Sequence, residues 1–168
     1  LPPSPNNLVI TGAFDGPLPG GLPKGVELYA LNAIADLSQY GISSANNGSG
    51  TTGSAEFEFP PVALTAGQFI YATSDSAGFA DFFGFDADFI DNSMNVNGDD
   101  AIELFHMGSV IDVFGNVNVD GTGQPWDYLD GWAYSKSTRF LGSTFNNGEW
   151  RYSGTNALDG ETSNLFAS

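Results

Sequence analysis

Residues 101–114 read AIELFHMGSVIDVF, and this stretch decides the fold class of the chain. It holds two apolar runs, residues 101–105 and 110–114, on either side of Met107 and Gly108. A two-residue connection of this kind joins antiparallel strands in a tight hairpin. The stretch therefore predicts a β-hairpin with one buried face.

The register of this hairpin brings two acidic side chains together. Pairing about the turn places Leu104 opposite Ile111 on the apolar face and Glu103 opposite Asp112 on the other face. Like charges directly across a strand pair destabilise it. Three explanations remain open: a different register, a cation or basic side chain at this place, or two solvated carboxylates that point apart.

Short apolar segments recur along the rest of the chain, with turns rich in Gly, Asn and Pro between them. Strands of about five residues at spacings near ten indicate an all-β sandwich or barrel. We expect further strands at residues 8–11, 26–31, 56–59, 69–72 and 149–152, and a shorter piece at 36–40.

One segment has a helical pattern instead of a strand pattern. Residues 76–83 place three Phe side chains at helical spacing, behind Ser76 as the cap and before Gly84 as the end. We therefore predict one short helix. Residues 1–7 are predicted to be a Pro-rich linker, and residues 8–168 a single domain.

The composition excludes several functions. The chain has 168 residues, with 20 acidic against 4 basic side chains and a net charge of −16. Four basic residues cannot neutralise a run of phosphates. We therefore expect no binding to nucleic acid or to a membrane. Without cysteine, zinc sites that use this ligand are excluded. The shortage of Lys and Arg is typical of a protein exposed to salty water.

Enzymatic activity is not expected. His106 is the only imidazole, and its place beside a hairpin turn suggests an exposed residue at a strand end. No serine stands in a G-x-S-x-G elbow, and no Gly-rich stretch has the spacing of a phosphate-binding loop.

Residues 116–130 contain the strongest pattern for a metal site. Oxygen-bearing side chains at alternate positions, a glycine and a later carboxylate match part of a calcium loop, in which a hard cation takes six or more oxygens. The candidate calcium ligands are Asn116, Asn118, Asp120 and Asp127. The alternative is an Asx-rich loop whose side chains cap its own backbone. Residues 95–100 form a second, weaker candidate with the same two interpretations.

Aromatic and polar side chains gather in the same region. An exposed ring beside polar groups is suited to a polysaccharide, because the ring stacks on the sugar while the polar groups bind its hydroxyls. The candidate sugar-binding residues are Gln124, Trp126, Tyr128 and Trp132. Packing in the core is the alternative for these aromatics, and it is favoured for Trp132 and Trp150.

Several segments, taken in order, resemble the lamin-tail-like domains, and in particular the bacterial branch found in secreted and surface proteins of many marine bacteria. The resemblance runs from about Leu8 to Ala157 and is carried by residues 8–11, 26–29, 36–38, 98–104, 113–115, 120–123, Trp126 and 130–134. It implies an immunoglobulin-like β-sandwich with long loops and no catalytic role. It also implies a place beside an extracellular nuclease, phosphatase or other hydrolase, and it lends weight to the acidic loop near Asp120.

Together these observations predict a non-catalytic accessory module of a secreted or cell-surface protein. It would bind polysaccharide through exposed aromatics and be stabilised by calcium. The alternative is a structural spacer or docking domain that contacts a partner domain of the same protein and has no small ligand.

Overall fold

The structure is a computed structural model that describes residues 7–136 and 142–165. Its strands and its α-helix are β1 (Leu8–Leu18), β2 (Leu22–Ala30), β3 (Tyr40–Ala45), β4 (Phe57–Glu58), β5 (Phe69–Thr73), α1 (Ser76–Phe83), β6 (Phe89–Ile90), β7 (Ala101–His106), β8 (Ser109–Phe114), β9 (Gly131–Ser135) and β10 (Trp150–Tyr152). Short 3-10 turns lie at Leu37–Gln39, Asn46–Gly48, Asn92–Met94 and Asn147–Glu149.

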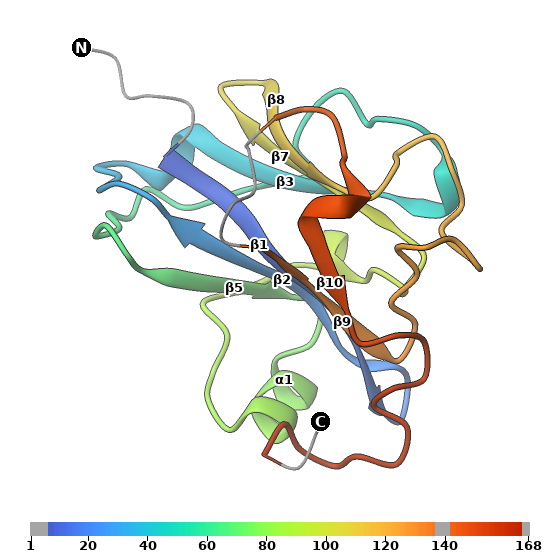
Figure 1. Ribbon diagram of the computed structural model, residues 1–168. Coiled ribbons are helices and arrows are strands. Elements are labelled where there is room, and N and C mark those ends of the chain that lie inside the picture. Colours follow the sequence, from blue (N-terminus) through green and yellow to red (C-terminus); the bar gives the residue numbers. More distant parts are fainter. Residues whose placement is uncertain (1–6, 137–141, 166–168) are drawn as a thin grey trace.

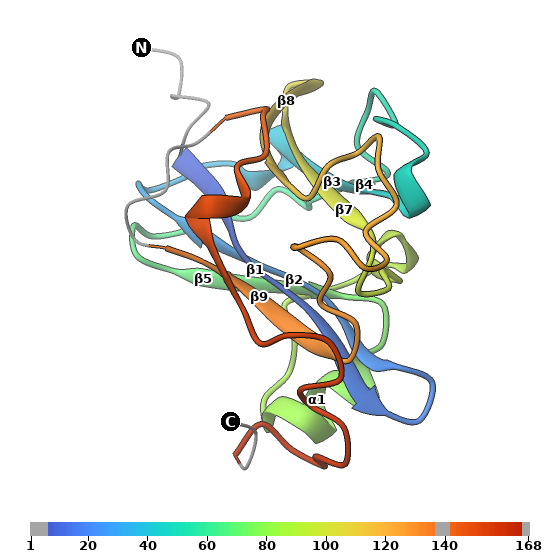
Figure 2. The ribbon, with the colours of Figure 1, turned by 45° about the vertical axis from the view of Figure 1, so that its right-hand side comes forward.

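The strands form two sheets. The large sheet has the order β10-β9-β1-β2-β5-β6 and the small sheet the order β4-β3-β7-β8. Figures 1 and 2 show the small sheet over one face of the large sheet and α1 at its opposite face. The predicted all-β sandwich with one short helix is confirmed. In the described residues no helix has the length and apolarity needed to span a bilayer.

The core lies between the two sheets. Alternate side chains of the central strands, such as Leu28, Ile42 and Leu104, are fully buried there. Phe114, at the end of β8, is the centre of an aromatic cluster whose other rings belong to Trp126, Tyr128, Phe145 and Trp150. This cluster fills the end of the sandwich near β9 and β10.

The predicted hairpin turn is present, but the predicted register beyond it is wrong. Met107 and Gly108 take φ values of 49° and 80°, as a tight two-residue hairpin turn requires. After two pairs that fit the prediction, the register shifts by one residue, and Ile111 is the extra residue of a β-bulge. The partner of Leu104 is therefore Asp112.

The bulge removes the like-charge contact. Glu103 pairs with Val113, and its carboxylate lies against Thr51 and Thr52. Asp112 is fully buried and accepts a hydrogen bond from the Ile10 amide at 2.8 Å. A different register, the first of the three explanations, is the correct one.

Two other local predictions need correction, and a third falls largely outside the described residues. The piece at 36–40 is a 3-10 turn that leads into β3, because the Asp36 carboxylate accepts a hydrogen bond from the Ser38 amide at 3.0 Å. Helix α1 ends at Gly84 as predicted, but its cap is Asp75 instead of Ser76. Of the predicted linker, residues 1–6 lie outside the described part of the chain.

Helix α1 covers only part of the outer face of the large sheet. Phe79 and Phe83 pack against Phe14 of β1, with ring centroids 5.8 and 5.2 Å apart. The side chains of β9 beside this contact remain partly open to solvent. The helix and β9 therefore border a recess on this face.

Candidate functional site

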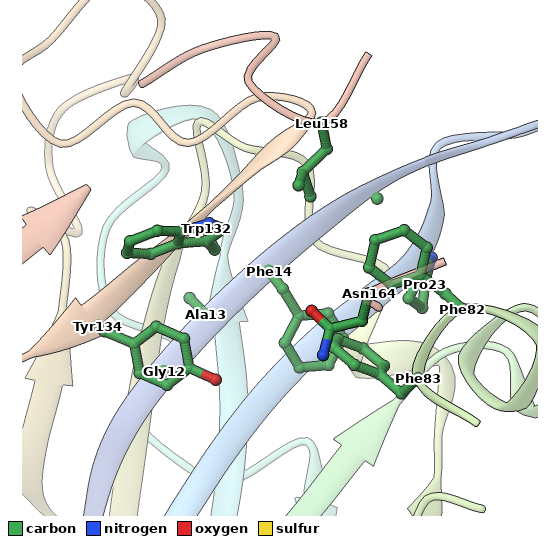
Figure 3. Close-up of a pocket in the computed structure, with 11 residues that line it drawn as sticks. Gly12, Ala13, Phe14, Pro23, Phe82, Phe83, Trp132, Tyr134, Leu158 and Asn164 are labelled. Atoms are coloured by element: carbon green, nitrogen blue, oxygen red, sulfur yellow. The ribbon is translucent and has the colours of Figure 1, made fainter. Parts of the chain in front are cut away.

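A cavity of about 240 Å³ lies on the outer face of the large sheet, between β9 and α1. Its wall is largely apolar and aromatic, as Figure 3 shows. The lining residues are Gly12, Ala13, Phe14, Gly16, Pro23, Phe82, Phe83, Trp132, Tyr134, Leu158 and Asn164.

Trp132 and Tyr134 form one side of this cavity. They flank Ala133, which points into the core, so both side chains project from the outer face of β9. Their ring centroids are 5.5 Å apart and tilted by 59°, and Tyr134 is 43% exposed. A Cβ at Gly12 would lie 3.1 Å from the Tyr134 ring, so this glycine leaves room for the ring to lie against β1.

A buried carboxylate holds the Tyr134 hydroxyl. Glu27 of β2 accepts hydrogen bonds from Thr11 at 2.7 Å, from Tyr71 at 2.9 Å and, at the long distance of 3.5 Å, from Tyr134. Burial and the neighbouring Glu27 charge raise the pKa of Tyr134 to about 12. The hydroxyl therefore stays protonated at neutral pH, and Glu27 positions the ring beside Trp132.

The other side of the cavity comes from α1 and the C-terminal segment. Phe14, Phe82 and Phe83 supply rings, and the Asn164 amide lies beside them in Figure 3. The Asn164 backbone amide donates to the Phe82 carbonyl at 2.8 Å, which anchors the segment to the helix. The cavity thus combines aromatic faces with two polar groups, the Asn164 amide and the Tyr134 hydroxyl.

The predicted sugar-binding residues fall in different places. Trp132 lines the cavity, whereas Gln124 is exposed in a loop and does not line it. Trp126 is only 4% exposed and Tyr128 is fully buried, so the prediction that they are exposed is wrong. Core packing, the alternative for these aromatics, holds for both and also for Trp150.

The burial of Trp126 and Tyr128 has a local cause. Gly115 and Gly121 lie against the Trp126 indole, where an added Cβ would come within 2.9 and 2.7 Å of the ring. Tyr128 donates its hydroxyl to the Asp100 carbonyl at 3.2 Å. The loop that carries them folds onto the aromatic cluster around Phe114, so neither ring can stack on a ligand.

Three of the four predicted calcium ligands, Asn116, Asp120 and Asp127, cap their own loop, whereas in the described part of the chain the Asn118 side chain does not. The Asn116 side chain accepts from the Asn118 amide at 3.0 Å and the Asp120 carboxylate from the Thr122 amide at 2.9 Å. Asp127 accepts from two amides of the loop, at 2.8 and 3.1 Å. Hydrogen bonds from Thr122 lower the pKa of Asp120. Within the described ranges, no three Asp, Glu or His side chains gather in a way that would hold a metal ion.

Sequence reasoning missed a buried polar network at the end of β1. Asp15 accepts from the amides of Gly98 and Asp130 at 3.1 and 3.3 Å, and lies 3.9 Å from the Lys24 ammonium. Lys24 also donates to Asn97. Burial, opposed by the Lys24 charge, raises the pKa of Asp15 to about 6. In the sequence Asp15 precedes Gly and Pro, which indicated a turn.

This raised pKa predicts a pH dependence of stability. Folding raises the pKa of Asp15 from 3.8 to about 6, so the folded protein binds this proton more tightly than the unfolded chain. The free energy of unfolding therefore falls as pH rises from about 4 to about 6, with a contribution of about 3 kcal/mol from this group. Asp15→Asn should remove that fall, which urea unfolding at a series of pH values measures.

Comparison with the wild type isolates the Asp15 contribution. Burial also raises the pKa of Asp100, and this group is unchanged in the variant. His106 acts in the opposite direction. Burial lowers its pKa, so the stability that it contributes is lost as pH falls below the pKa of this histidine in the unfolded chain. The exposed Asp86→Asn variant should keep the wild-type profile. Parallel profiles for Asp15→Asn and the wild type would contradict the assignment.

His106 is not the exposed residue that the sequence suggested. It is the last residue of β7, is buried, and packs against Tyr40 with ring centroids 4.6 Å apart and ring planes tilted by 49°. Among the residues that the structure describes, its Nε2 atom has no hydrogen-bond partner. The turn places its backbone at the strand end, but the Tyr40 ring covers the imidazole.

Comparisons of the chain with protein-family models, curated proteins and solved structures find no match. What the structure defines is a class of fold, an all-β sandwich of two sheets with one short helix. The cavity beside Trp132 is the feature of this fold from which we infer a function.

Proposed function

We propose that this protein is a non-catalytic binding module that attaches to a neutral saccharide at the cavity beside Trp132 and Tyr134. The observation that carries the proposal is the pair of adjacent, solvent-accessible rings on the outer face of β9. Apolar ring faces stack on the C–H faces of a sugar, and the Asn164 amide and the Tyr134 hydroxyl supply hydrogen bonds to its hydroxyls.

The size and charge of the site narrow the ligand. A cavity of about 240 Å³ is smaller than the range of about 300–1,000 Å³ that is usual for drug-sized ligands, so it suits one ring rather than a long chain. The net charge of −16 disfavours sulfated or otherwise anionic glycans. The ligand we propose is therefore the terminal residue of a neutral polysaccharide.

The wider setting is also part of the proposal. The acidic, Lys-poor composition suits an extracellular protein in salty water. The resemblance to lamin-tail-like domains suggests an immunoglobulin-like module beside a hydrolase domain of the same secreted protein. In this setting the module would keep the hydrolase close to a polymeric substrate.

Affinity electrophoresis against neutral and sulfated glycans tests the binding site. The wild type should be retarded by at least one neutral glycan, and Trp132→Ala should lose the retardation because the stacking surface is removed. Phe69→Ala is the matched control, since Phe69 is an exposed aromatic of the same sheet that does not line the cavity. Equal retardation of Trp132→Ala and the wild type would overturn the site.

A structural spacer or protein-docking domain is the second candidate. It is favoured by large apolar side chains that are exposed outside the cavity, among them Phe69, Phe85 and Ile90. Absence of retardation of the folded wild type by every glycan in the panel would favour this candidate over the binding module.

A further inference from the structure

A second cavity of about 240 Å³ lies over the outer face of the small sheet. Ile102 and Leu104 of β7 point into the core, so Glu103 between them points to the opposite side, where this cavity is. The wall is mainly polar, and its polar side chains are Glu103, Asn116, Asn118, Ser143 and Thr144. This cavity shares no lining residue with the proposed saccharide site, which lies on the large sheet.

Glu103 is an unusual residue to find at the base of a cavity. It is only 3% exposed, and one oxygen, Oε2, accepts from the Thr51 hydroxyl at 3.0 Å and the Thr52 amide at 3.3 Å. Within residues 7–136 and 142–165, its Oε1 atom has no hydrogen-bond donor and no Lys, Arg or His forms an ion pair with it. A buried carboxylate without a counter-charge is costly, so this cavity favours a positively charged ligand.

The other polar side chains of the cavity all carry oxygen ligands. Ser143 and Thr144 supply hydroxyls, and the side-chain amide of Asn118 makes no hydrogen bond to a described side chain or backbone group. Asn116 caps the Asn118 amide with its Oδ1 atom, which retains a second lone pair. Carboxylate, amide and hydroxyl oxygens without sulfur or imidazole are the ligands of a hard metal cation.

We propose that this polar cavity binds a hard cation, Ca²⁺ or Na⁺, with Glu103 as its only charged ligand and Asn118, Ser143 and Thr144 as neutral ones. A single carboxylate predicts weak binding, with a Kd of about 0.1–1 mM for Ca²⁺, as in extracellular modules of low ligand charge. The site is separate from the carboxylates of Asp120 and Asp127, which cap the neighbouring loop.

The cation would connect three loops that are far apart in the sequence. Glu103 already holds the loop of Thr51 and Thr52, while Asn118 and Thr144 belong to two other loops that line the same cavity. A cation bound only by the folded protein would stabilise this arrangement by mass action.

Terbium luminescence tests the proposal on the full chain. Tb³⁺ replaces Ca²⁺ at oxygen sites, and the Trp126 indole can sensitise it, because Trp126 lies against Gly115 in the cavity wall. With choline chloride as the background salt, we expect saturable Tb³⁺ emission that Ca²⁺ displaces. Displacement by Na⁺ at similar concentration would identify Na⁺ as the resident ion.

The variants distinguish this site from the neighbouring loop. Glu103→Gln should weaken Tb³⁺ binding at least about tenfold, because affinity follows the charge of the ligands. Asn118→Ala should weaken it less, and it keeps the test decisive if Glu103→Gln fails to fold. The double variant Asp120→Asn with Asp127→Asn should bind as the wild type does.

Three results would overturn the proposal. They are the absence of saturable emission, unchanged binding in both Glu103→Gln and Asn118→Ala, and loss of binding in the Asp120/Asp127 double variant. Trp132→Ala should leave Tb³⁺ binding unchanged, so failure of the saccharide site and failure of the cation site give different results.

Discussion

Replacing Trp126 with alanine should lower the free energy of unfolding by about 4 kcal/mol, the middle of the range for buried Trp and Phe truncations. The indole packs edge-on against Phe114 and Phe145, with centroids 6.1 and 6.0 Å apart, and Gly115 and Gly121 lie against it. Truncation leaves a cavity that these rigid neighbours cannot fill. Urea unfolding followed by circular dichroism measures the loss.

Trp132→Ala is the matched control, since it removes the same side chain from the outer face of β9. Trp132 is half-buried and lies outside the core, so the expected loss is about 1 kcal/mol. The two variants separate two roles that the sequence could not: Trp126 supports the core, and Trp132 is the residue that we propose contacts the saccharide. Similar losses of stability in both variants would contradict this division.

Replacing Asp112 with alanine should cost about 3 kcal/mol, because it removes a fully buried acceptor and its hydrogen bond to the Ile10 amide. The Asp112 carboxylate on β8 accepts from the Ile10 amide on β1 at 2.8 Å. This bond connects the edge strand of the small sheet to the large sheet. Without it the Ile10 amide loses this acceptor in a place from which water is excluded.

Two further variants show whether the loss comes from this contact. Asp112→Asn keeps an acceptor of the same shape, so we expect it to lose less than Asp112→Ala. Asp86→Ala removes a carboxylate from an exposed loop and should change the unfolding free energy by less than about 0.5 kcal/mol. If Asp112→Ala were as stable as Asp86→Ala, the contact between the sheets would contribute nothing to the free energy of unfolding, and the prediction would be wrong.

The fold class could be predicted because its signals are local. Alternating apolar residues and turn residues indicated most of the strands, and Gly84 indicated the end of the helix. The bulge at Ile111 could not be predicted, because the contact that accompanies it joins residues 102 positions apart in the sequence. In the shifted register Asp112 pairs with Leu104, and its carboxylate accepts a hydrogen bond from the Ile10 amide of the other sheet. A contact between two sheets leaves no trace in the periodicity of one strand.

The aromatic residues at the candidate site also show that local sequence patterns do not reveal contacts between distant segments. Trp126 and Tyr128 are two positions apart, as are Trp132 and Tyr134, so local spacing treats the two pairs alike. In the structure the second pair lies on a strand whose inward residue, Ala133, is in the core, whereas the first pair lies in a loop folded onto Phe114. Neighbours from distant segments decide which rings remain accessible. The polar cavity at Glu103 depends in the same way on three separate loops.

The buried acids also have a consequence for finding relatives of this protein. Most acidic side chains on the surface can change position in the sequence during evolution, because their effect on solubility depends on the net charge and not on where each one lies. The interior set accepts hydrogen bonds from particular amide and hydroxyl groups, so each position is constrained by geometry. This set comprises Asp15, Glu27, Asp100, Glu103 and Asp112. The spacing of these acids would serve as a fingerprint for homologues that have diverged too far for overall sequence similarity to reveal them.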